Sequence, residues 1–381
     1  MSYIKILGSG KVGTKIIKEL YLDHTVIAVD SDETKLQEIK KLTRIETEQA
    51  DLTKKQDIDR ILQQDDTDLI INALPGSIGY KILANTIDYG IDSINLSLFK
   101  QNPLELDQRA KDKGVTAIVD AGIAPGLNNL ILGYHSQQME VEKYKCYVGS
   151  LPYERNLPLQ YKAPYSPLDV LKDYIQKAHY IEDNKKIVKD GLSDPEYIDI
   201  DDIGTLEAFN TVGIRTLMET MDIPNMTEKT LRYPGHRKLM KTLIELGFLS
   251  DTPVNINGKN IKPLELTSKL LFPKWQLKKG EAEFTVMLVI IEGKKEGNDK
   301  KVEYTLFQKD GEESTSNSLA QTAGSTCAAL TELLLSNNKI TEGIVPPEYL
   351  GYSKDNFIFV WQYLKDNEIN IDKNEIVYRE I

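Results

Sequence analysis

Cysteine is scarce in this chain of 381 residues, which carries only Cys146 and Cys327. Two cysteines without a C-x-x-C pair make neither a disulfide framework nor a metal site, and they suit a reducing, cytoplasmic compartment. The histidines His24, His135 and His179 share no ligand spacing with one another. We therefore expect no metal in this protein.

Long apolar runs and an excess of positive charge are also missing. The run at 284–291 is only as long as a strand, and the chain opens directly on strand-like residues, so we expect neither a membrane span nor a signal peptide. With 47 basic against 58 acidic residues the net charge is −11, and no basic stripe dominates, which argues against a nucleic-acid partner. What remains is a soluble protein long enough for two domains.

A glycine-rich turn near the N-terminus is the strongest motif. The apolar, β-branched run 3–7 predicts a buried strand, the sequence Gly8-Ser9-Gly10-Lys11-Val12-Gly13 follows it, and 14–21 has the spacing of a helix. A strand, a G-x-G-x-x-G turn and a helix in this order are typical of dinucleotide binding. In that arrangement Gly8 permits the tight turn, Gly10 admits the pyrophosphate, Gly13 allows close packing, and the helix N-terminus faces the phosphates.

An acidic residue follows at the distance that this motif requires. The strand predicted at 25–29 leads into Asp30, 17 residues after Gly13, where the acid that binds the ribose belongs. No arginine stands at Ser31 or Asp32, so we predict NAD, with NADP as the alternative. The predicted cofactor-binding residues are Gly8, Ser9, Gly10, Lys11, Val12, Gly13, Asp30, Asp51, Ala73, Leu74 and Pro75.

The rest of the N-terminal part alternates strands and helices, which predicts a parallel α/β sheet. Further strands are expected at 44–52, 68–74, 92–96 and 115–120, and helices at 31–42, 54–64, 80–89 and 104–113. Six strands make a full Rossmann dinucleotide-binding domain of order 3-2-1-4-5-6. We predict this domain at 1–136, a second α+β domain for substrate binding and dimerisation at 137–345, and a C-terminal segment at 346–381 that can pack back on the first domain.

Two strand ends of the first domain carry polar residues suited to chemistry. Asn95-Leu96-Ser97 ends the fifth strand and Val119-Asp120 the sixth, ahead of Pro125, which suits the first turn of a helix running to residue 134. Ligands of open α/β sheets bind at the carboxyl ends of the strands, so we expect Asp120 where substrate meets nicotinamide. The alternative is that Asp120 caps the helix.

The second domain has the pattern of an α+β fold. Long strands are expected at 141–148, 284–291 and 301–307, the last two pairing across the turn-rich 293–300. Helices are expected at 168–179, 214–221, 236–246 and 318–335, with one more at 357–365. The irregular segment 150–167, rich in proline and tyrosine, has the length of a binding loop. The apolar surface of the paired strands predicts a homodimer formed through this domain.

Segment 229–236 concentrates reactive side chains. Arg232 has the planar guanidinium that matches a carboxylate, and His236 is a residue type that exchanges protons near neutral pH. A surface ion pair for Arg232 and a helix-start position for His236 are the plainer alternatives. Arg215 lies in a second polar cluster at 210–216 and is equally compatible with a structural role.

On these motifs the sequence resembles the saccharopine dehydrogenase family, and most of all its short members of the L-lysine 6-dehydrogenase type. The matching pieces span nearly the whole chain and are the glycine turn at 8–13, NALP at 72–75, VDAGIAPGLNNL at 119–130, NTVGIRTL at 210–217, LRYPGH at 231–236 and EGIVPPE at 342–348. Family members often carry Asp-x-Ser-Tyr at the fifth strand, where this chain has Asn95 and Leu98. They also often carry an aspartate before the glycine of NTVGIRTL, where this chain has Val212.

The resemblance implies a nicotinamide-dependent oxidoreductase that acts on the C–N bond of an amino acid. It implies that Arg232 belongs to the substrate-carboxylate site and Asp120 to the pocket beside the nicotinamide. Asp120 and His236 are therefore the catalytic candidates, and Arg232, Tyr233, Asn128 and Arg215 are the candidate substrate-binding residues.

The expected reaction is oxidative deamination of the ε-amino group of L-lysine, in which hydride leaves the amine-bearing carbon and water hydrolyses the imine to the semialdehyde. One alternative is a saccharopine- or carboxyspermidine-type reductase, for which Arg215 or Arg155 would be the second carboxylate anchor. The other is a dinucleotide-binding regulator without catalysis.

Overall fold

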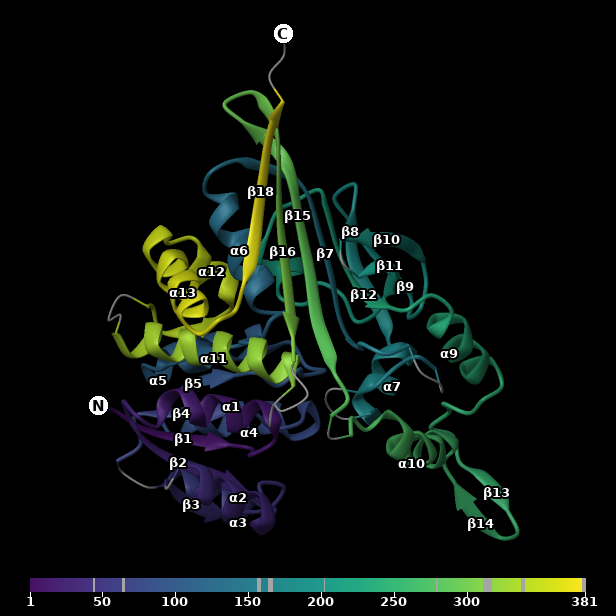
Figure 1. The fold of residues 1–381 in the computed structure, drawn as a ribbon. Coiled ribbons are helices and arrows are strands. Elements are labelled where there is room, and N and C mark those ends of the chain that lie inside the picture. Colours follow the sequence, from purple (N-terminus) through teal and green to yellow (C-terminus); the bar gives the residue numbers. More distant parts are fainter. Residues whose placement is uncertain are drawn as a thin grey trace. The chain divides into compact units, whose positions relative to one another are not determined.

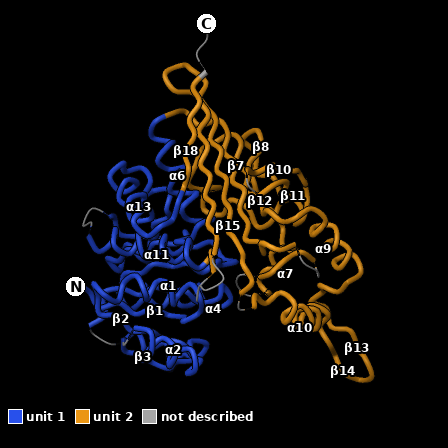
Figure 2. Tube along the Cα trace, viewed as in Figure 1, with its two compact units in different colours: residues 1–138, 320–370 blue, residues 139–319, 371–381 orange. Residues whose placement is uncertain are grey.

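The computed structural model describes residues 1–43, 45–63, 66–155, 159–163, 167–201, 203–278, 280–310, 317–336 and 340–378 (Figure 1). The chain forms two compact units, one of Met1–Gln138 with Ala320–Asn370 and one of Met139–Leu319 with Ile371–Ile381 (Figure 2). An α/β unit and a second unit with a mixed sheet agree with the predicted fold class. The division of the chain differs from the predicted one, because residues 320–345 belong to the first unit and residues 371–381 to the second.

The first unit is built on a parallel sheet of order β17-β6-β5-β4-β1-β2-β3. Its strands are β1 (Tyr3–Leu7), β2 (Thr25–Asp30), β3 (Glu46–Gln49), β4 (Leu69–Asn72), β5 (Asp92–Asn95), β6 (Thr116–Ile118) and β17 (Gly343–Val345). The first six take the predicted order 3-2-1-4-5-6. Every residue of β4 is buried, which explains its unbroken apolar run. β17 pairs with β6, and its three residues are too few to show a strand pattern in the sequence.

Helices follow the strands of this sheet. They are α1 (Lys11–Leu20), α2 (Glu33–Thr43), α3 (Lys55–Leu62), α4 (Gly76–Asp88), the 3₁₀ turn η1 (Pro103–Leu106), α5 (Asp107–Lys113) and α6 (Leu127–Ser136). Pro125 does not lie in the first turn of α6, contrary to the prediction. The helix begins at Leu127 because its N-cap, Gly126, has a φ of 141°, a backbone conformation that is not helical.

The C-terminal helices of the first unit approach the N-terminal ones closely. They are α11 (Ser318–Ser336), α12 (Pro347–Gly351) and α13 (Lys354–Asp366). A Cβ added to Gly133 of α6 would lie 2.0 Å from the Glu348 carbonyl oxygen, and one added to Gly351 would lie 2.2 Å from the Leu130 carbonyl oxygen. Glycines on both helices therefore let the backbones of α6 and α12 touch, and this contact holds residues 346–351 in the first unit (Figure 1).

The second unit is built on a mixed sheet of order β10-β11-β12-β7-β15-β16-β18, with β8 and β9 joined through β12. Its strands are β7 (Glu140–Pro152), β8 (Lys177–Glu182), β9 (Lys185–Asp190), β10 (Glu196–Ile200), β11 (Gly204–Asn210), β12 (Asn225–Arg232), β15 (Glu283–Lys295), β16 (Asn298–Lys309) and β18 (Ile371–Tyr378). β12 and β7 are parallel neighbours, whereas β7, β15, β16 and β18 run antiparallel to one another. The predicted strands at 141–148, 284–291 and 301–307 are all present and longer than expected.

The described residues of the second unit form the helices α7 (Pro167–Ile175), α8 (Leu217–Thr220), α9 (His236–Glu245) and α10 (Pro263–Trp275). The helix predicted at 168–179 is shorter because His179 pairs in β8 with Val188 of β9. The helix predicted at 214–221 starts late because Arg215 has a φ of 39°. Of the binding loop predicted at 150–167, residues 156–158 and 164–166 lie outside the described residues.

The strands expected to form a dimer interface are already covered within the unit. β18 occupies the outer edge of β16, and apolar residues of the pair, such as Met287 and Tyr304, are buried. The two strands meet at the tight turn Glu296–Gly297, not across 293–300. These strands therefore give no support for dimerisation, and the homodimer remains a prediction. In the parts of the chain that the structure describes, no helix has both the length and the apolar composition needed to cross a bilayer.

Gly133→Ala should destabilise the protein by about 1–3 kcal/mol, because the added methyl group overlaps the Glu348 carbonyl and forces α6 and α12 apart. Urea unfolding followed by circular dichroism measures the loss. Ser136→Ala, on the same helix, removes an atom without adding one and is the control. Equal stability of Gly133→Ala and the wild type would show that α6 and α12 are not packed this closely.

Candidate active site

The glycine turn Gly8–Gly13 forms a cradle in which Gly8 and Gly13 pack tightly against neighbouring backbone, whereas the space beside Gly10 is open. Gly8 has a φ of +100°, and a Cβ there would lie 2.8 Å from the Ala73 carbonyl oxygen. A Cβ on Gly13 would lie 1.9 Å from the Gly8 carbonyl oxygen, whereas nothing lies within 4 Å of a Cβ on Gly10. The space above Gly10 is where a pyrophosphate would approach the backbone.

Helix α1 offers its N-terminus to the same space. It begins at Lys11, three residues earlier than predicted, so Lys11, Val12 and Gly13 form its first turn. Its N-cap Gly10 has no side chain that could accept the first N–H groups. Unsatisfied N–H groups and the positive end of the helix dipole favour an anion at this position.

Asp30 ends β2 and braces the cradle. Its Oδ2 accepts the Ser9 N–H at 2.7 Å, and its Oδ1 accepts the Asp32 N–H at 2.9 Å. The Lys35 Nζ lies 4.0 Å from Oδ2, and the Asp30 side chain is largely buried. The carboxylate is thus fixed at the carboxyl end of β2, where a ribose would hydrogen-bond to it.

The remaining predicted cofactor residues lie after β3 and β4. Asp51 accepts the Thr53 hydroxyl at 2.6 Å, and the Thr53 hydrogen bonds hold the Asp51 pKa below its ordinary value. Ala73 and Leu74 are the residues nearest to Gly8, and Pro75 is the N-cap of α4. The structure thus gathers Gly8–Gly13, Asp30, Ala73 and Leu74 around one cradle, and this cradle fits a dinucleotide.

A buried amide ladder, which sequence reasoning missed, ties together the carboxyl ends of β4, β5 and β6. Asn72 Nδ2 donates to Asn95 Oδ1 at 3.0 Å, and Asn95 Nδ2 donates to the Ile118 carbonyl at 3.2 Å. The Ser97 hydroxyl donates to the Leu74 carbonyl at 2.7 Å. Asn95, at a position where the family often has aspartate, therefore serves as donor and acceptor at once.

Asp120 follows β6 in a segment folded tightly on itself. It has a φ of 52° and is 1% exposed. A Cβ on Gly126 would lie 1.9 Å from the Gly122 carbonyl oxygen, and Asn128 Oδ1 accepts the Gly126 N–H at 2.9 Å. Asn128 therefore fixes the turn. Because Gly126 is the N-cap of α6, Asp120 does not have the capping role that was its alternative.

The second unit buries the guanidinium of Arg232 among aromatic rings. Arg232 is 5% exposed, and its Nε–H donates to the Tyr174 hydroxyl at 3.0 Å. Its Nη1 donates to the Leu231 carbonyl at 2.7 Å, and its Cζ lies 4.5 Å from the centre of the Tyr161 ring. Trp275 packs edge-on against Tyr161 with ring centres 5.0 Å apart. Ring faces and hydroxyls thus stabilise a cation that burial would otherwise disfavour.

His236 anchors this arrangement as a neutral imidazole. Burial and the Arg232 charge lower its pKa to about 3. Its Nδ1 lies 2.9 Å from the Leu159 carbonyl, which can only accept, so Nδ1 carries the proton. Its Nε2 then accepts the Tyr174 hydroxyl at 3.1 Å. Since the Tyr174 proton points to His236, the Tyr174 oxygen is free to accept from Arg232 Nε–H.

These contacts change the predicted roles of two residues. His236 is fully buried, with both ring nitrogens hydrogen-bonded, so it is not placed to exchange protons with a substrate near neutral pH. Tyr233 follows the end of β12 and packs in the apolar cluster of Leu231 and Tyr147, whereas Tyr161, Tyr174 and Trp275 beside Arg232 belong to another cluster. Its hydroxyl donates to the Pro152 carbonyl at 2.9 Å, and Arg155 lies over its ring at 4.7 Å.

Sequence reasoning also missed Tyr161, Tyr174 and Trp275. They come from three separate elements, and only Tyr161 carried a signal, its place in the predicted binding loop 150–167. Arg215 precedes α8, and its carbonyl accepts the Met218 N–H at 3.2 Å, so its backbone shapes the start of this helix. A part for Arg215 in substrate binding stays a prediction. No group of three or more His, Cys, Asp or Glu among the described residues could hold a metal ion.

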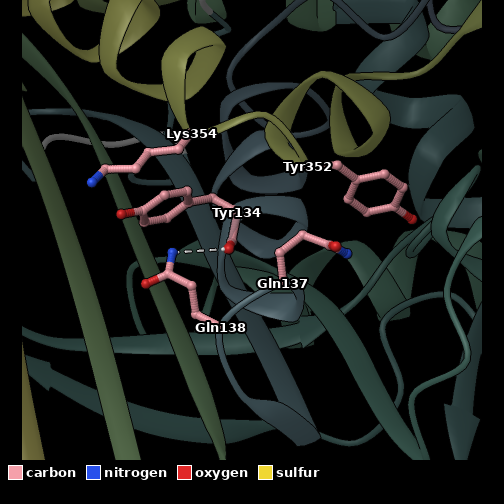
Figure 3. Close-up of a pocket in the computed structure, with 5 residues that line it drawn as sticks. All are labelled: Tyr134, Gln137, Gln138, Tyr352 and Lys354. Carbon is pink, nitrogen blue, oxygen red and sulfur yellow. Dashed lines mark hydrogen bonds between the residues drawn. The ribbon is translucent and has the colours of Figure 1, made fainter.

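A separate hollow lies on the first unit between α6 and the start of α13 (Figure 3). It has a volume of about 340 Å³ and is lined by Tyr134, Gln137, Gln138, Tyr352 and Lys354. Gln138 Nε2 donates to the Tyr134 carbonyl at 3.1 Å, and the Tyr134 ring stacks on Phe357 at 3.9 Å. None of the predicted site residues lines this hollow.

A Rossmann sheet with an open glycine cradle, joined to a mixed-sheet unit, is the arrangement of the nicotinamide-dependent oxidoreductases. Within that class the chain belongs to the saccharopine dehydrogenase family. Residues 4–118 match the saccharopine dehydrogenase NADP binding domain, and residues 122–366 match the saccharopine dehydrogenase C-terminal domain. The family and the oxidoreductase class predicted from the sequence are confirmed.

Similar proteins include two named enzymes. The mitochondrial alpha-aminoadipic semialdehyde synthase of Rattus norvegicus is 26% identical over 263 residues, which cover 65% of this chain and 28% of that protein. The NADP(+)-dependent, L-glutamate-forming saccharopine dehydrogenase of Saccharomyces cerevisiae is 23% identical over 277 residues, which cover 68% of this chain and 61% of that protein. The chain thus spans less than a third of the length of the rat protein.

Two solved structures share the fold. Apo saccharopine dehydrogenase (L-Glu forming) from Saccharomyces cerevisiae superposes with a TM-score of 0.79 at 19% identity, over 99% of this chain and 100% of that one. The homospermidine synthase of Legionella pneumophila, solved with NAD, superposes with a TM-score of 0.64 at 13% identity, over 98% of this chain and 91% of that one.

Protonation of His236 should make the protein acid-sensitive. The pKa of His236 is 6.5 in the unfolded chain and about 3 in the folded protein. Between these two pH values only the unfolded chain binds the proton, so the free energy of unfolding decreases as the pH falls from 6.5 to 3. This single group contributes a slope of about 1.4 kcal/mol per pH unit. Urea unfolding between pH 4 and 7 should therefore be less pH-dependent in His236→Gln than in the wild type. Tyr174→Phe keeps the buried imidazole and should keep the wild-type slope, and parallel curves for all three would contradict the assignment.

Proposed function

We propose that the protein is an NAD(P)-dependent oxidoreductase that removes the ε-amino group of L-lysine, or of a close relative, to give the semialdehyde. The observation that supports this most directly is Arg232, held rigid and desolvated in the second unit of a saccharopine dehydrogenase family member. A planar guanidinium in such a setting matches the α-carboxylate of an amino acid.

Each residue has one task in this proposal. The cradle of Gly8, Gly10 and Gly13, with Asp30, holds the dinucleotide, and the nicotinamide supplies the redox chemistry by taking hydride from the amine-bearing carbon. Arg232 binds and orients the α-carboxylate. Asp120 accepts the ammonium proton or orients the water that hydrolyses the imine. His236 acts on the substrate only through Tyr174, by keeping the hydroxyl in place for Arg232.

The second candidate is a saccharopine-type reaction, which joins or separates an aldehyde and an amino acid. The names of the yeast and rat relatives favour it. A substrate with further carboxylates needs another cationic anchor, and Arg155 stacks on Tyr233, which packs in a different cluster from the rings beside Arg232. That placement argues against Arg155 and leaves Arg215 as the candidate second anchor for the larger substrate. The third candidate is a dinucleotide-binding regulator without catalysis. It is motivated by Asn95, Leu98 and Val212, which stand where family members often carry aspartate, tyrosine and aspartate.

One assay separates the three. Purified protein is incubated with NAD or NADP and either L-lysine or saccharopine, and reduced nicotinamide is followed by its absorbance. Ammonia release with L-lysine supports deamination, whereas glutamate release with saccharopine supports the second candidate. If neither substrate is turned over but dinucleotide binding is measurable, the result supports the non-catalytic regulator. We further infer a reducing compartment such as the cytoplasm, where the buried Cys146 and Cys327 stay thiols.

Arg232→Ala should weaken substrate binding and transition-state stabilisation together by about 2–5 kcal/mol, because it removes one partner of a buried charge pair. The loss should be much smaller for the substrate amide, which never used the charge. Asp120→Asn keeps the shape of the side chain, so binding should survive while turnover falls. Steady-state kinetics of both variants on both ligands test the assignment. Weaker NAD binding in Arg232→Ala, with substrate affinity intact, would contradict it.

Asp30 should favour NAD over NADP, because its carboxylate repels a 2′-phosphate and no arginine follows at Ser31 or Asp32. Asp30→Ser should move the ratio of kcat/KM values toward NADP by about tenfold or more. Asp32→Ser, beside it, is the control and should leave the ratio unchanged. Higher efficiency of the wild type with NADP would overturn this preference.

A further inference from the structure

Glu207 is a buried carboxylate that the proposed function does not use. It lies in β11 and is 3% exposed. In the antiparallel pair of β11 and β12 it stands directly opposite Arg232, and residues directly opposite one another project from the same face of a sheet. Phe209, two residues along β11 on that face, packs against Tyr174 with ring centres 6.0 Å apart. Glu207 therefore projects to the side of the sheet on which Arg232 is bound by tyrosines.

The carboxylate of Glu207 pairs with Arg237 instead of Arg232. Its Oε1 accepts the Arg237 Nε–H at 2.7 Å, and its Oε2 accepts the Gly235 N–H at 3.1 Å. Arg237 is held in turn, because its Nη1 donates to the Leu192 carbonyl at 3.3 Å. Within the described ranges, both oxygens of Glu207 are thus engaged away from the residue that faces it across the strands.

The turn before α9 explains this pairing. Gly235 is the N-cap of α9, has a φ of 96° and carries no side chain that could accept the first N–H groups of the helix. Glu207 accepts the N–H of this residue, as the acidic side chain of a capping box does. The positive end of the helix dipole favours a carboxylate there. Since Arg237 belongs to the first turn of the same helix, one short segment gives Glu207 both of its partners.

A released Glu207 would compete with the substrate for Arg232. Side chains directly opposite in an antiparallel pair have Cβ atoms about 4.5–5.5 Å apart, which is within reach of a glutamate and an arginine. Opposite charges attract strongly at a buried site, where water does not screen them. A partner tethered in the same chain also acts at an effective concentration of about millimolar or more. A free amino acid at lower concentration would not displace it.

We propose that Arg237 is a positioning residue that sets the affinity for the substrate carboxylate by holding Glu207 away from Arg232. This inference rests on the proposed function, in which Arg232 binds the carboxylate of an amino acid. The start of α9 then serves Arg232 twice. His236 orients the Tyr174 hydroxyl toward it, and Arg237 withholds a competing carboxylate. Arg237 acts on the substrate only through Glu207.

Arg237→Met tests this proposal, because methionine keeps an apolar stem and removes the guanidinium. Glu207 then turns to Arg232, so the KM for L-lysine should rise about tenfold or more. The dissociation constant should rise equally in calorimetric titrations of L-lysine into the NADH-bound protein. The affinities for NAD and for L-lysinamide, which has no carboxylate, should stay within about twofold of the wild type. The matched control is Arg109→Met, which breaks an exposed ion pair with Asp88 in the first unit and should change none of these values.

Removing the competitor separates positioning from a structural role. Glu207→Gln combined with Arg237→Met should restore the wild-type KM for L-lysine, and Glu207→Gln alone should bind L-lysine at least as tightly as the wild type. If the two residues formed only a structural ion pair, Glu207→Gln alone would weaken L-lysine and L-lysinamide binding as Arg237→Met does. That result overturns the proposal, as does an unchanged KM in Arg237→Met.

The proposed function fails separately. If Arg232→Ala leaves the affinity for L-lysine unchanged, the proposed function is refuted, and this inference with it. If Arg232→Ala weakens L-lysine binding but Arg237→Met does not, only the inference is wrong. Should circular dichroism show Arg237→Met unfolded, Arg237→Gln takes its place. It removes the charge but keeps a hydrogen-bond donor, and it should give the same rise in KM for L-lysine; an unchanged KM overturns the proposal.

Discussion

The burial of the Arg232 guanidinium is the constraint on which the chemistry of the second unit depends. A desolvated cation must be compensated, and Tyr161, Tyr174 and a backbone carbonyl do so. The same charge, together with burial, keeps His236 neutral. A neutral imidazole with its proton on Nδ1 accepts from Tyr174, which orients the Tyr174 oxygen toward Arg232. The cation and the histidine thus fix each other, and the histidine is withdrawn from proton exchange.

The first unit relies on a different constraint, the contact of backbones at glycines. At Gly8, Gly13, Gly133 and Gly351 an added Cβ would lie within 3 Å of a carbonyl oxygen. The close backbone contacts at these positions therefore require glycine. At Gly10 the space is open. Glycines of one short motif therefore have opposite tasks. Gly8 and Gly13 allow close packing of the backbone, whereas Gly10 leaves space for a ligand.

Local sequence patterns predicted the first unit well, because each strand, turn and helix of a Rossmann fold is formed by consecutive residues and has its own local pattern. The order of β1 to β6, the cradle and Asp30 followed from them. The three-residue β17 and the return of 320–345 did not, since both depend on contacts between distant parts of the chain. For the same reason, only part of the surroundings of Arg232 could be predicted from the sequence. Its cation stood in a motif, but Tyr161, Tyr174 and Trp275 come from separate elements, and Tyr233 packs in a different cluster.

The amide ladder bears on which group handles the proton. Asn95 donates to the Ile118 carbonyl and accepts from Asn72, and an ionised aspartate can do only the second. An amide at this position is therefore matched to its partners and keeps the carboxyl ends of β4 and β5 uncharged. With His236 neutral and Val212 in place of an acid, the acidic side chain at the end of β6 is Asp120. We therefore propose Asp120 as the proton acceptor in the proposed C–N oxidation, and under this proposal the charge of that residue should govern turnover.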